Sequence, residues 1–358
     1  MINSSARYEK LRAYMKEQGI DAIHIISPEN FLYFSGYNNP DGHMLITMNE
    51  SYSFNDFRYI EAATDESFDD VKVVLSTEMT MFDVIKKEGI GRIAIEDTKL
   101  TVAELNAIKV SLNDTNCDTV NLGSYLNELR AVKDQYEIDS IVAAQRIAEG
   151  AFHHLLSVIN YNMTEIEVAA ELEYYMKKNG SEKPAFDTIA VSGKSSSMPH
   201  GVPANKKLEK GFLTLDYGAI VNGYCSDMTR TIVIGKADED IKKVYNTVLN
   251  AQLSAIDAIT EGADAGEIDK VARDIIYGAG YEGKFGHGLG HGVGLLIHEL
   301  PVQNPRSFGT KLEVGNIVTV EPGIYIAGKY GCRIEDMIAV TKGGKMNLTN
   351  CPKELIEI

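Results

Sequence analysis

Residues 286–299 read GHGLGHGVGLLIHE and carry three of the eight histidines in this 358-residue chain. Eight glycines fall within residues 278–294. A segment so rich in glycine has few side chains to fill a hydrophobic core. Its backbone can approach another group closely and so position the few side chains that it carries. The three histidines within twelve residues, His287, His291 and His298, therefore favour a functional site. A fourth, His200, lies in a predicted loop between two β-rich segments.

Two β-rich segments elsewhere share one pattern, apolar-Thr-apolar-acid-x-Gly. The first is LTLDYG (213–218) and the second is VTVEPG (318–323), and each is followed by another acidic strand-like segment. The acids concerned are Asp216, Asp227, Glu321 and Glu335. Alignment of the two segments does not choose between Glu335 and its neighbour Asp336. The pattern predicts a domain with an internal pseudo-two-fold repeat.

The repeat would bring four carboxylates to one place, and their charge must then be balanced. Like charges at short range force protonation unless cations are present. Two divalent metal ions supply four positive charges and match the four acids. A network with Arg230 and Arg333 is the alternative, but two guanidinium groups leave half of the negative charge unmatched. The residue types therefore favour a metal site.

The distribution of glycine divides the chain. Residues 1–125 contain 6 of the 31 glycines, and residues 126–358 contain the other 25. The first part alternates helical and β-type apolar spacing, which predicts a small αβ domain. Its strands are predicted at about 21–26, 44–48, 71–75 and 90–95. Helices along the whole chain are predicted at about 8–18, 101–112, 134–159, 165–180, 238–260 and 264–277.

Charge and composition exclude several classes of protein. The chain has 35 basic and 51 acidic side chains and a net charge of −16, which argues against nucleic acid or an anionic membrane as partner. No run approaches the roughly 20 apolar residues of a membrane helix, and the N-terminus has no apolar signal-peptide core. The four cysteines are widely scattered, without a CxxC pair. A cytoplasmic location is predicted.

Together, LDYG (215–218), SDMTRT (226–231), the histidine segment, TVEPGIY (319–325) and RIED (333–336) resemble the metal-dependent branch of the creatinase/aminopeptidase P/prolidase family, of peptidase family M24 type. NDFRYIEAA (55–63) is similar to part of the family's smaller N-terminal domain. The resemblance implies an α/β (α+β) fold. A creatinase-type αβ domain is expected at residues 1–125 and a pita-bread catalytic domain with pseudo-two-fold symmetry at residues 126–358.

The resemblance also implies residue roles, and it selects Glu335 over Asp336 as a ligand. The implied metal ligands are Asp216, Asp227, His291, Glu321 and Glu335. The implied catalytic residues are Glu321, His200, His287 and His298, and the implied substrate-binding residues are His200, His298, Tyr325 and Arg333. Two divalent ions are expected. Manganese suits this ligand set best, with cobalt or zinc as alternatives.

The implied function is hydrolysis of Xaa-Pro peptide bonds by a metal-bridging hydroxide, as an Xaa-Pro aminopeptidase or an Xaa-Pro dipeptidase. Short proline-containing peptides are the expected partners, and a homodimer is the expected assembly. A methionine aminopeptidase-like enzyme is a weaker alternative, because such enzymes usually lack the N-terminal domain. A non-catalytic peptide-binding protein of the same fold is weaker still, because no ligand is missing from this sequence.

Overall fold

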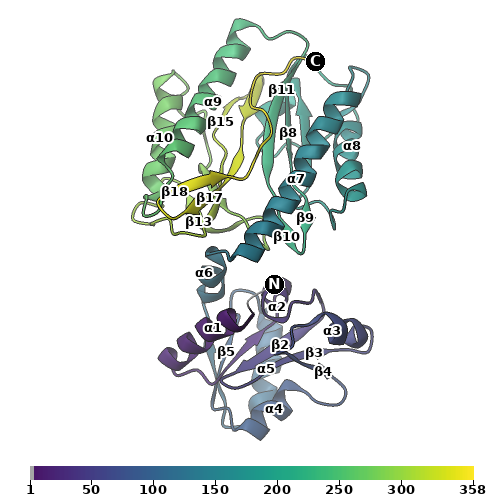
Figure 1. Ribbon diagram of the computed structural model, residues 1–358, viewed down its shortest axis with the longest axis vertical. Coiled ribbons are helices and arrows are strands. Elements are labelled where there is room, and N and C mark those ends of the chain that lie inside the picture. The colour runs from purple at the N-terminus through teal and green to yellow at the C-terminus, as the bar shows by residue number, and fades with distance from the viewer. Residues whose placement is uncertain (1–3) are drawn as a thin grey trace. The chain divides into compact units, whose positions relative to one another are not determined.

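The computed structural model describes residues 4–358, which form two compact units (Figure 1). One unit ends at Glu128 and the other spans Leu129–Ile358. The N-terminus is predicted to have no apolar signal-peptide core, and residues 1–3 of this stretch lie outside the described residues. Within residues 4–358, no helix is both long enough and apolar enough to cross a bilayer.

The N-terminal unit is built on one six-stranded sheet with the order β4-β3-β2-β1-β5-β6. The pairs β1–β2 and β2–β3 are antiparallel, and the other three pairs are parallel. The strands are β1 (Ala22–Ile25), β2 (His43–Thr47), β3 (Ser51–Asn55), β4 (Lys72–Leu75), β5 (Arg92–Ile95) and β6 (Asp118–Asn121). The helices are α1 (Ser4–Gln18), α2 (Pro28–Ser35), α3 (Ile60–Glu66), α4 (Met81–Glu88) and α5 (Val102–Leu112). The predicted αβ architecture is confirmed, but β3 and β6 are not among the predicted strands.

The second unit contains two long helix pairs and several antiparallel sheets. A short helix, α6 (Tyr125–Ala131), precedes them. The helices are α7 (Gln135–Val158), α8 (Glu165–Lys178), the 3-10 helix η1 (Gly193–Ser197), α9 (Glu239–Ala258) and α10 (Ala265–Gly278). The strands of the first half are β7 (Ile189–Ser192), β8 (Gly211–Tyr217), β9 (Ile220–Val221), β10 (Tyr224–Cys225) and β11 (Met228–Ile234). Those of the second half are β12 (Gly290–Gly292), β13 (Glu299–Gln303), β14 (Ile317–Val320), β15 (Gly323–Ile326), β16 (Tyr330–Arg333), β17 (Asp336–Thr341) and β18 (Gly344–Asn347).

Side-chain caps set where the long helices begin. Thr164 accepts a hydrogen bond from the backbone N–H of Glu167, and the Glu167 carboxylate accepts one from the Thr164 N–H, which completes a capping box before α8. Asp264 caps α10 through the backbone N–H groups of Gly266 and Glu267. A cap of this kind contributes about 1 kcal/mol. These two caps occupy the same place in the two halves of the unit.

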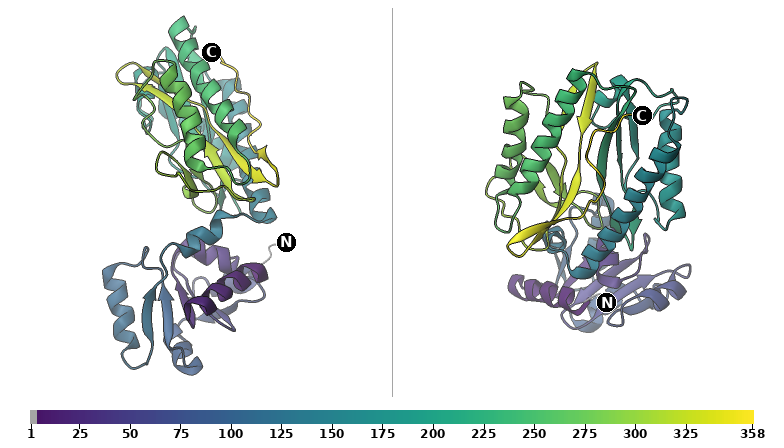
Figure 2. Two further views of the ribbon diagram at one scale, coloured as in Figure 1. Left: turned by 90° about the vertical axis from the view of Figure 1, so that its left-hand side faces the viewer. Right: turned by 45° about the horizontal axis from the view of Figure 1, so that its top comes forward.

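The internal repeat is evident in the helix positions. α7 and α9 end at residues 158 and 258, and α8 and α10 begin at 165 and 265, a spacing of 100 residues in both cases. The antiparallel pair β8–β11 of the first half corresponds to β14–β17 of the second. In the second unit the two helix pairs lie on opposite sides of the strands (Figures 1 and 2). The predicted pseudo-two-fold domain is confirmed.

Candidate metal centre

Each half of the repeat places two acids beside the ends of an antiparallel strand pair. Asp216 lies near the end of β8, opposite Thr229 of β11, and Asp227 immediately precedes β11. In the second half, Glu321 directly follows β14 and Glu335 directly precedes β17. In both halves, therefore, one acid lies at the end of the first strand and the other directly before its antiparallel partner.

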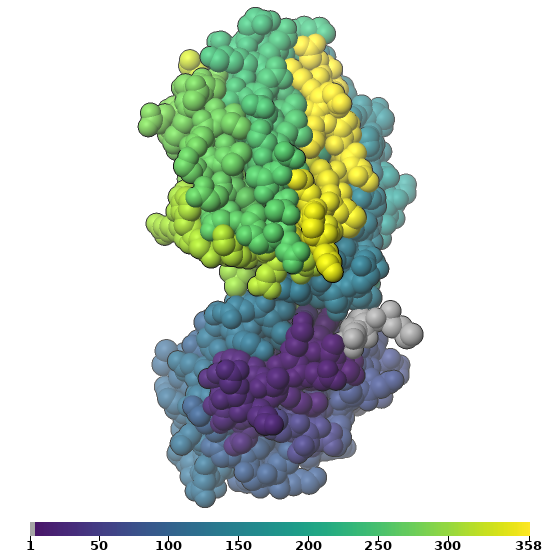
Figure 3. Space-filling view, turned by 60° about the vertical axis from the view of Figure 1, so that its left-hand side comes forward, coloured from purple at the N-terminus to yellow at the C-terminus, as the bar shows by residue number. Residues whose placement is uncertain are grey.

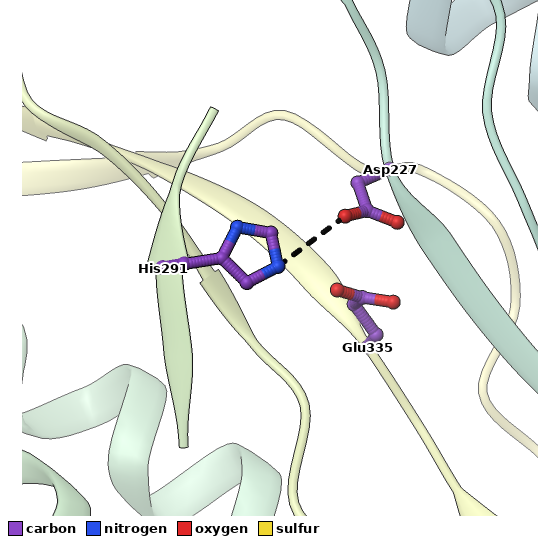
Figure 4. Close-up of side chains that lie close together, drawn as sticks. All are labelled: Asp227, His291 and Glu335. Carbon is purple, nitrogen blue, oxygen red and sulfur yellow. Dashed lines mark ion pairs between the residues drawn. The ribbon is translucent and has the colours of Figure 1, made fainter. Parts of the chain in front are cut away.

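Two of these acids and one histidine come close enough to hold one metal ion (Figure 4). Asp227, His291 and Glu335 each offer a ligand atom within 4.8 Å of the others. The Nε2 atom of His291 lies 3.6 Å from Oδ2 of Asp227 and 3.3 Å from Oε1 of Glu321. Figure 4 shows the imidazole directed toward the carboxylates of Asp227 and Glu335. Side chains from three separate segments thus converge on one point.

The orientation of His291 follows from its own hydrogen bonds. Its backbone N–H donates to Oγ1 of Thr319 over 3.1 Å. Its Nδ1 atom lies 3.1 Å from the carbonyl oxygen of Gly292. Because a carbonyl oxygen can only accept, Nδ1 carries the proton and Nε2 is the nitrogen that faces the acids. Metal-binding histidines are commonly oriented in this way.

Glycine is required on both sides of this histidine. A Cβ atom at Gly290 would lie 2.0 Å from the carbonyl oxygen of Thr319, and one at Gly292 would lie 2.2 Å from that of Leu300. Both distances are far shorter than two non-bonded atoms can approach, so a side chain at either position would force the strands apart. The glycine pattern of the sequence therefore allows the close strand packing that positions His291.

The protein groups alone do not keep the four carboxylates ionised. Burial, and then the neighbouring acids, raise the pKa values of Asp227 and Glu335 well above the ordinary range. Burial would also raise the pKa of Glu321, but the hydrogen bond and charge of His291 lower it to about 2. Burial opposes protonation of His291, yet Glu321 raises the pKa of its imidazole to about 9.

These acids and the imidazole fit divalent cations. Oδ1 of Asp216 is buried and has no hydrogen-bond partner, and burial raises the pKa of this carboxyl group despite the nearby Arg333. Carboxylate and imidazole donors are the ligand types that bind manganese, zinc and related ions. Divalent cations would offset the repulsion that favours protonation of the buried acids.

A hydrogen-bonded chain supports Asp216. Arg333 donates from Nη2 to Oδ2 of Asp216 over 2.6 Å and from Nη1 to the Tyr325 hydroxyl over 2.7 Å. The Tyr325 hydroxyl lies 3.0 Å from Nε2 of His287, whose Nδ1 faces the carbonyl oxygen of Gly288 at 2.7 Å. Since Nδ1 must donate to that carbonyl, Nε2 accepts from Tyr325 when the imidazole is neutral. Burial lowers the pKa of His287 and favours this neutral form.

His298 and His200 lie on the exposed side of the same region. The rings of His298 and His291 are 4.3 Å apart between centroids, at an angle of 69°. Burial, followed by the charge of His291 and then that of His200, shifts the pKa of His298 downward. The loop that carries His200 is tied to the site through Pro199, whose carbonyl oxygen accepts from Arg333 over 3.3 Å. All residues to which the family resemblance assigns a role therefore lie in one region.

Asp336 lies outside this cluster. Its carboxylate accepts from Arg230, Lys353 and Asn347 over 2.9, 2.6 and 2.8 Å. Arg230 also donates to the backbone carbonyl oxygen of Glu335 over 2.6 Å. The arginine network considered as an alternative to metal is thus incomplete, because Arg230 pairs with Asp336 and not with the four acids.

The C-terminal segment completes the surroundings of Arg230. The carbonyl oxygens of Cys351 and Pro352 accept from its guanidinium over 2.9 and 3.0 Å. The following residue, Lys353, accepts a hydrogen bond at its carbonyl oxygen from the hydroxyl of Tyr245 in α9 over 3.0 Å. Figure 3 shows this last part of the chain, in yellow, running along the surface beside α9. The end of the chain therefore helps to fix the backbone next to Glu335.

Two threonines support the acids, and sequence reasoning assigns them no role. Oγ1 of Thr229 donates to Oε2 of Glu335 over 2.7 Å and accepts from Nε of Arg333 over 3.1 Å. Oγ1 of Thr319 lies 3.3 Å from Oε1 of Glu321. The signal is present in the sequence, since both threonines belong to the acidic motifs SDMTRT and VTVEPG.

Comparisons with known proteins agree with this geometry. Residues 139–342 match Metallopeptidase family M24, and residues 7–132 match the Creatinase/Prolidase N-terminal domain. The Xaa-Pro dipeptidase of Pyrococcus furiosus is 38% identical over 362 residues, which cover 98% of this chain and 99% of that protein. The solved Xaa-Pro dipeptidase from Bacillus anthracis superposes with a TM-score of 0.94 at 39% identity, covering 99% and 100% of the two chains. An X-Pro aminopeptidase from Thermotoga maritima gives a TM-score of 0.90 at 35% identity, covering 98% and 100%.

Proposed function

The chain belongs to metallopeptidase family M24, and from this membership we propose that it is a hydrolase that cleaves Xaa-Pro peptide bonds with two divalent metal ions. The family resemblance drawn from the sequence motifs and the predicted fold class are both confirmed. The observation that carries the proposal is the convergence of Asp227, His291 and Glu335, with ligand atoms within 4.8 Å of one another.

We propose that five residues hold the metal ions. They are Asp216, Asp227, His291, Glu321 and Glu335. The unpartnered buried oxygen of Asp216 and the raised pKa values of Asp227 and Glu335 support this assignment. Manganese is the proposed metal, because a carboxylate-rich site with one imidazole suits it. Two bound divalent ions lower the pKa of water, so that hydroxide is available near neutral pH.

The protein side chains supply the remaining chemistry. Glu321, whose carboxylate lies 3.3 Å from Nε2 of His291, is proposed to accept a proton from the attacking water. His200 and His298, on the exposed side, are proposed to bind the peptide and to polarise its scissile carbonyl. Arg333 and Tyr325 hold Asp216 and His287 in place through the hydrogen bonds described above.

The preferred substrate is expected to carry proline directly after the scissile bond. Proline lacks the backbone N–H through which most peptidases hold a substrate, so a dedicated site must recognise the imide in another way. A panel of Xaa-Pro and Xaa-Ala dipeptides and Xaa-Pro-Yaa tripeptides, assayed with Mn²⁺, tests this. Equal rates for Xaa-Ala and Xaa-Pro would refute the proposal. The ratio of dipeptide to tripeptide cleavage separates a dipeptidase from an aminopeptidase.

Replacing His298 or His200 by alanine is expected to leave the metal content unchanged and to lower kcat/KM by roughly 10²–10³-fold. The reason is the loss of a transition-state contact without the loss of a ligand. Metal analysis of each purified variant, beside its kinetics, distinguishes the two effects. Loss of metal from His298→Ala, with retention in His291→Ala, would reverse the assignment of these histidines.

We also propose that the enzyme is a cytoplasmic homodimer, with its functional domains at residues 1–125 and 126–358. All four cysteines are buried and unpaired, which supports a reducing compartment. A closed two-fold pair is the commonest assembly of soluble oligomers. Light scattering at assay concentration should give twice the chain mass. A monomeric mass with full activity would contradict the dimer.

A further inference from the structure

The segment that leads to His291 has little support of its own. Every second residue from Gly286 to Gly294 is glycine, and glycine gives the backbone the greatest freedom. From Gly290 onward the segment is held as β12 between β13 and β14. Residues 282–289, which include His287, belong to no helix or strand. Some other contact must fix the position of this histidine.

Arg273 of α10 provides that contact. Its Nη1 atom donates to the carbonyl oxygen of Phe285, and its Nη2 atom donates to that of His287, both over 2.8 Å. Its guanidinium carbon lies 4.3 Å from the centroid of the Phe285 ring, a cation–π distance. The planar guanidinium group of Arg273 thus contacts two backbone carbonyl groups and one aromatic ring of the segment.

Asp269, one helical turn earlier, holds Arg273 and extends the contact. Its two carboxylate oxygens accept from Nε and Nη2 of Arg273 over 2.9 and 2.8 Å. Its Oδ1 atom also accepts from the backbone N–H of Leu289 over 3.0 Å. The side chains of Asp269 and Arg273 are only 2% and 16% exposed, so solvent weakens this pair little. The pair therefore fixes three alternate residues, at 285, 287 and 289.

The residues so fixed are connected directly to the proposed catalytic groups. The carbonyl oxygen of Leu289 accepts from the backbone N–H of Glu321 over 2.9 Å. His287, held at its carbonyl by Arg273, accepts from the hydroxyl of Tyr325 at Nε2. Movement of the segment would change both contacts at once.

We propose that Asp269 and Arg273 are a positioning pair, which holds His287 in its hydrogen bond with Tyr325 and Leu289 in its bond with Glu321. The proposal rests on the proposed function, because it places His287 and Glu321 in a peptide-hydrolysing site. The hydrogen bonds described for the pair reach residues 285, 287 and 289 and none of the five proposed metal ligands, so the pair acts through the backbone of the glycine-rich segment.

Three variants test the pair. Arg273→Gln keeps a donor for Asp269 but cannot hold both carbonyl oxygens. Arg273→Lys keeps the charge, so Asp269 stays paired, but an ammonium group lacks the planar fork. Lys270→Gln is the matched control, because Lys270 pairs with Asp274 on the same helix with the same four-residue spacing. These two control side chains are 53% and 60% exposed, and the pair makes no hydrogen bond to the glycine-rich segment.

The first readout is the ¹⁵N NMR spectrum of histidine side chains in the protein loaded with diamagnetic Zn²⁺. In the wild type and in Lys270→Gln, His287 is expected in the tautomer protonated at Nδ1. In Arg273→Gln its signals should move toward a mixture of tautomers, with Arg273→Lys between the two. Melting temperatures of all variants identify any general loss of folding.

The second readout is steady-state kinetics with an Xaa-Pro dipeptide. Arg273→Gln should lower kcat/KM by about 10–100-fold, chiefly through kcat, as for other groups that orient an active site. Unchanged His287 signals in both Arg273 variants, or an equal change in Lys270→Gln, would overturn the positioning pair. If the wild type cleaves no Xaa-Pro peptide, the proposed function fails, and the NMR comparison still decides the positioning pair.

Discussion

Replacing Glu335 by alanine is expected to remove metal from the site and to reduce Xaa-Pro hydrolysis to the background rate. Glu335 is buried, and its carboxylate lies among Asp227, His291 and the Thr229 hydroxyl. The adjacent Asp336 cannot take its place, because its carboxylate is engaged by Arg230 and Lys353. Elemental analysis of the purified variant, beside its activity with added Mn²⁺, measures both effects.

The matched control for this variant is Asp336→Asn, one residue further along the chain. Its amide can keep the shape of the side chain and some of its hydrogen bonds. The variant is expected to lose stability, since it weakens a buried ion pair. It should nevertheless retain metal and most activity per folded molecule. Loss of metal from Asp336→Asn, with retention in Glu335→Ala, would show that the wrong acid has been assigned.

The second large effect is expected for Glu321→Gln, which keeps the size of the side chain but cannot accept a proton. With metal supplied in excess, kcat should fall by roughly 10²–10⁴-fold, the usual contribution of a general base. Glu313→Gln makes the same chemical change at an exposed residue shortly before β14 and should behave like the wild type. A metal-loaded Glu321→Gln variant with the wild-type rate would contradict the proposed role of Glu321 as base.

The long helices could be predicted because their signals are local. The capping box that begins at Thr164 and the apolar spacing after it place α8 within two residues of its observed bounds. β3 is not among the predicted strands, although Ser51-Tyr52-Ser53-Phe54-Asn55 alternates polar and apolar residues as a strand does. Asn55 donates to Oγ of Ser53 over 2.8 Å and accepts from Asn39 over 2.8 Å. The alternation predicts one exposed polar face, but the structure buries Ser51, Ser53 and Asn55 as well, where hydrogen bonds satisfy their side chains inside the sheet.

The candidate site could be predicted in its residue types but not in its register. Successive residues of a strand face opposite sides, so a shift of one residue exchanges the roles of Glu335 and Asp336. The internal repeat leaves that shift open, and only the family resemblance chooses between the two acids. The structure places Asp336 opposite Val320 at the start of β17, with its carboxylate on Arg230. That outcome depends on strand pairing and on a distant C-terminal segment, which short motifs do not encode.

A metal titration of the apo-enzyme tests the proposed two-metal hydrolysis most directly. Protein freed of metal by a chelator, and checked by elemental analysis, is titrated with Mn²⁺ while hydrolysis of an Xaa-Pro dipeptide is followed. No hydrolysis is expected in the metal-free protein, and the rate should rise with added Mn²⁺ and saturate at two ions per chain. Full activity in protein shown to be metal-free would contradict the proposed two-metal hydrolysis.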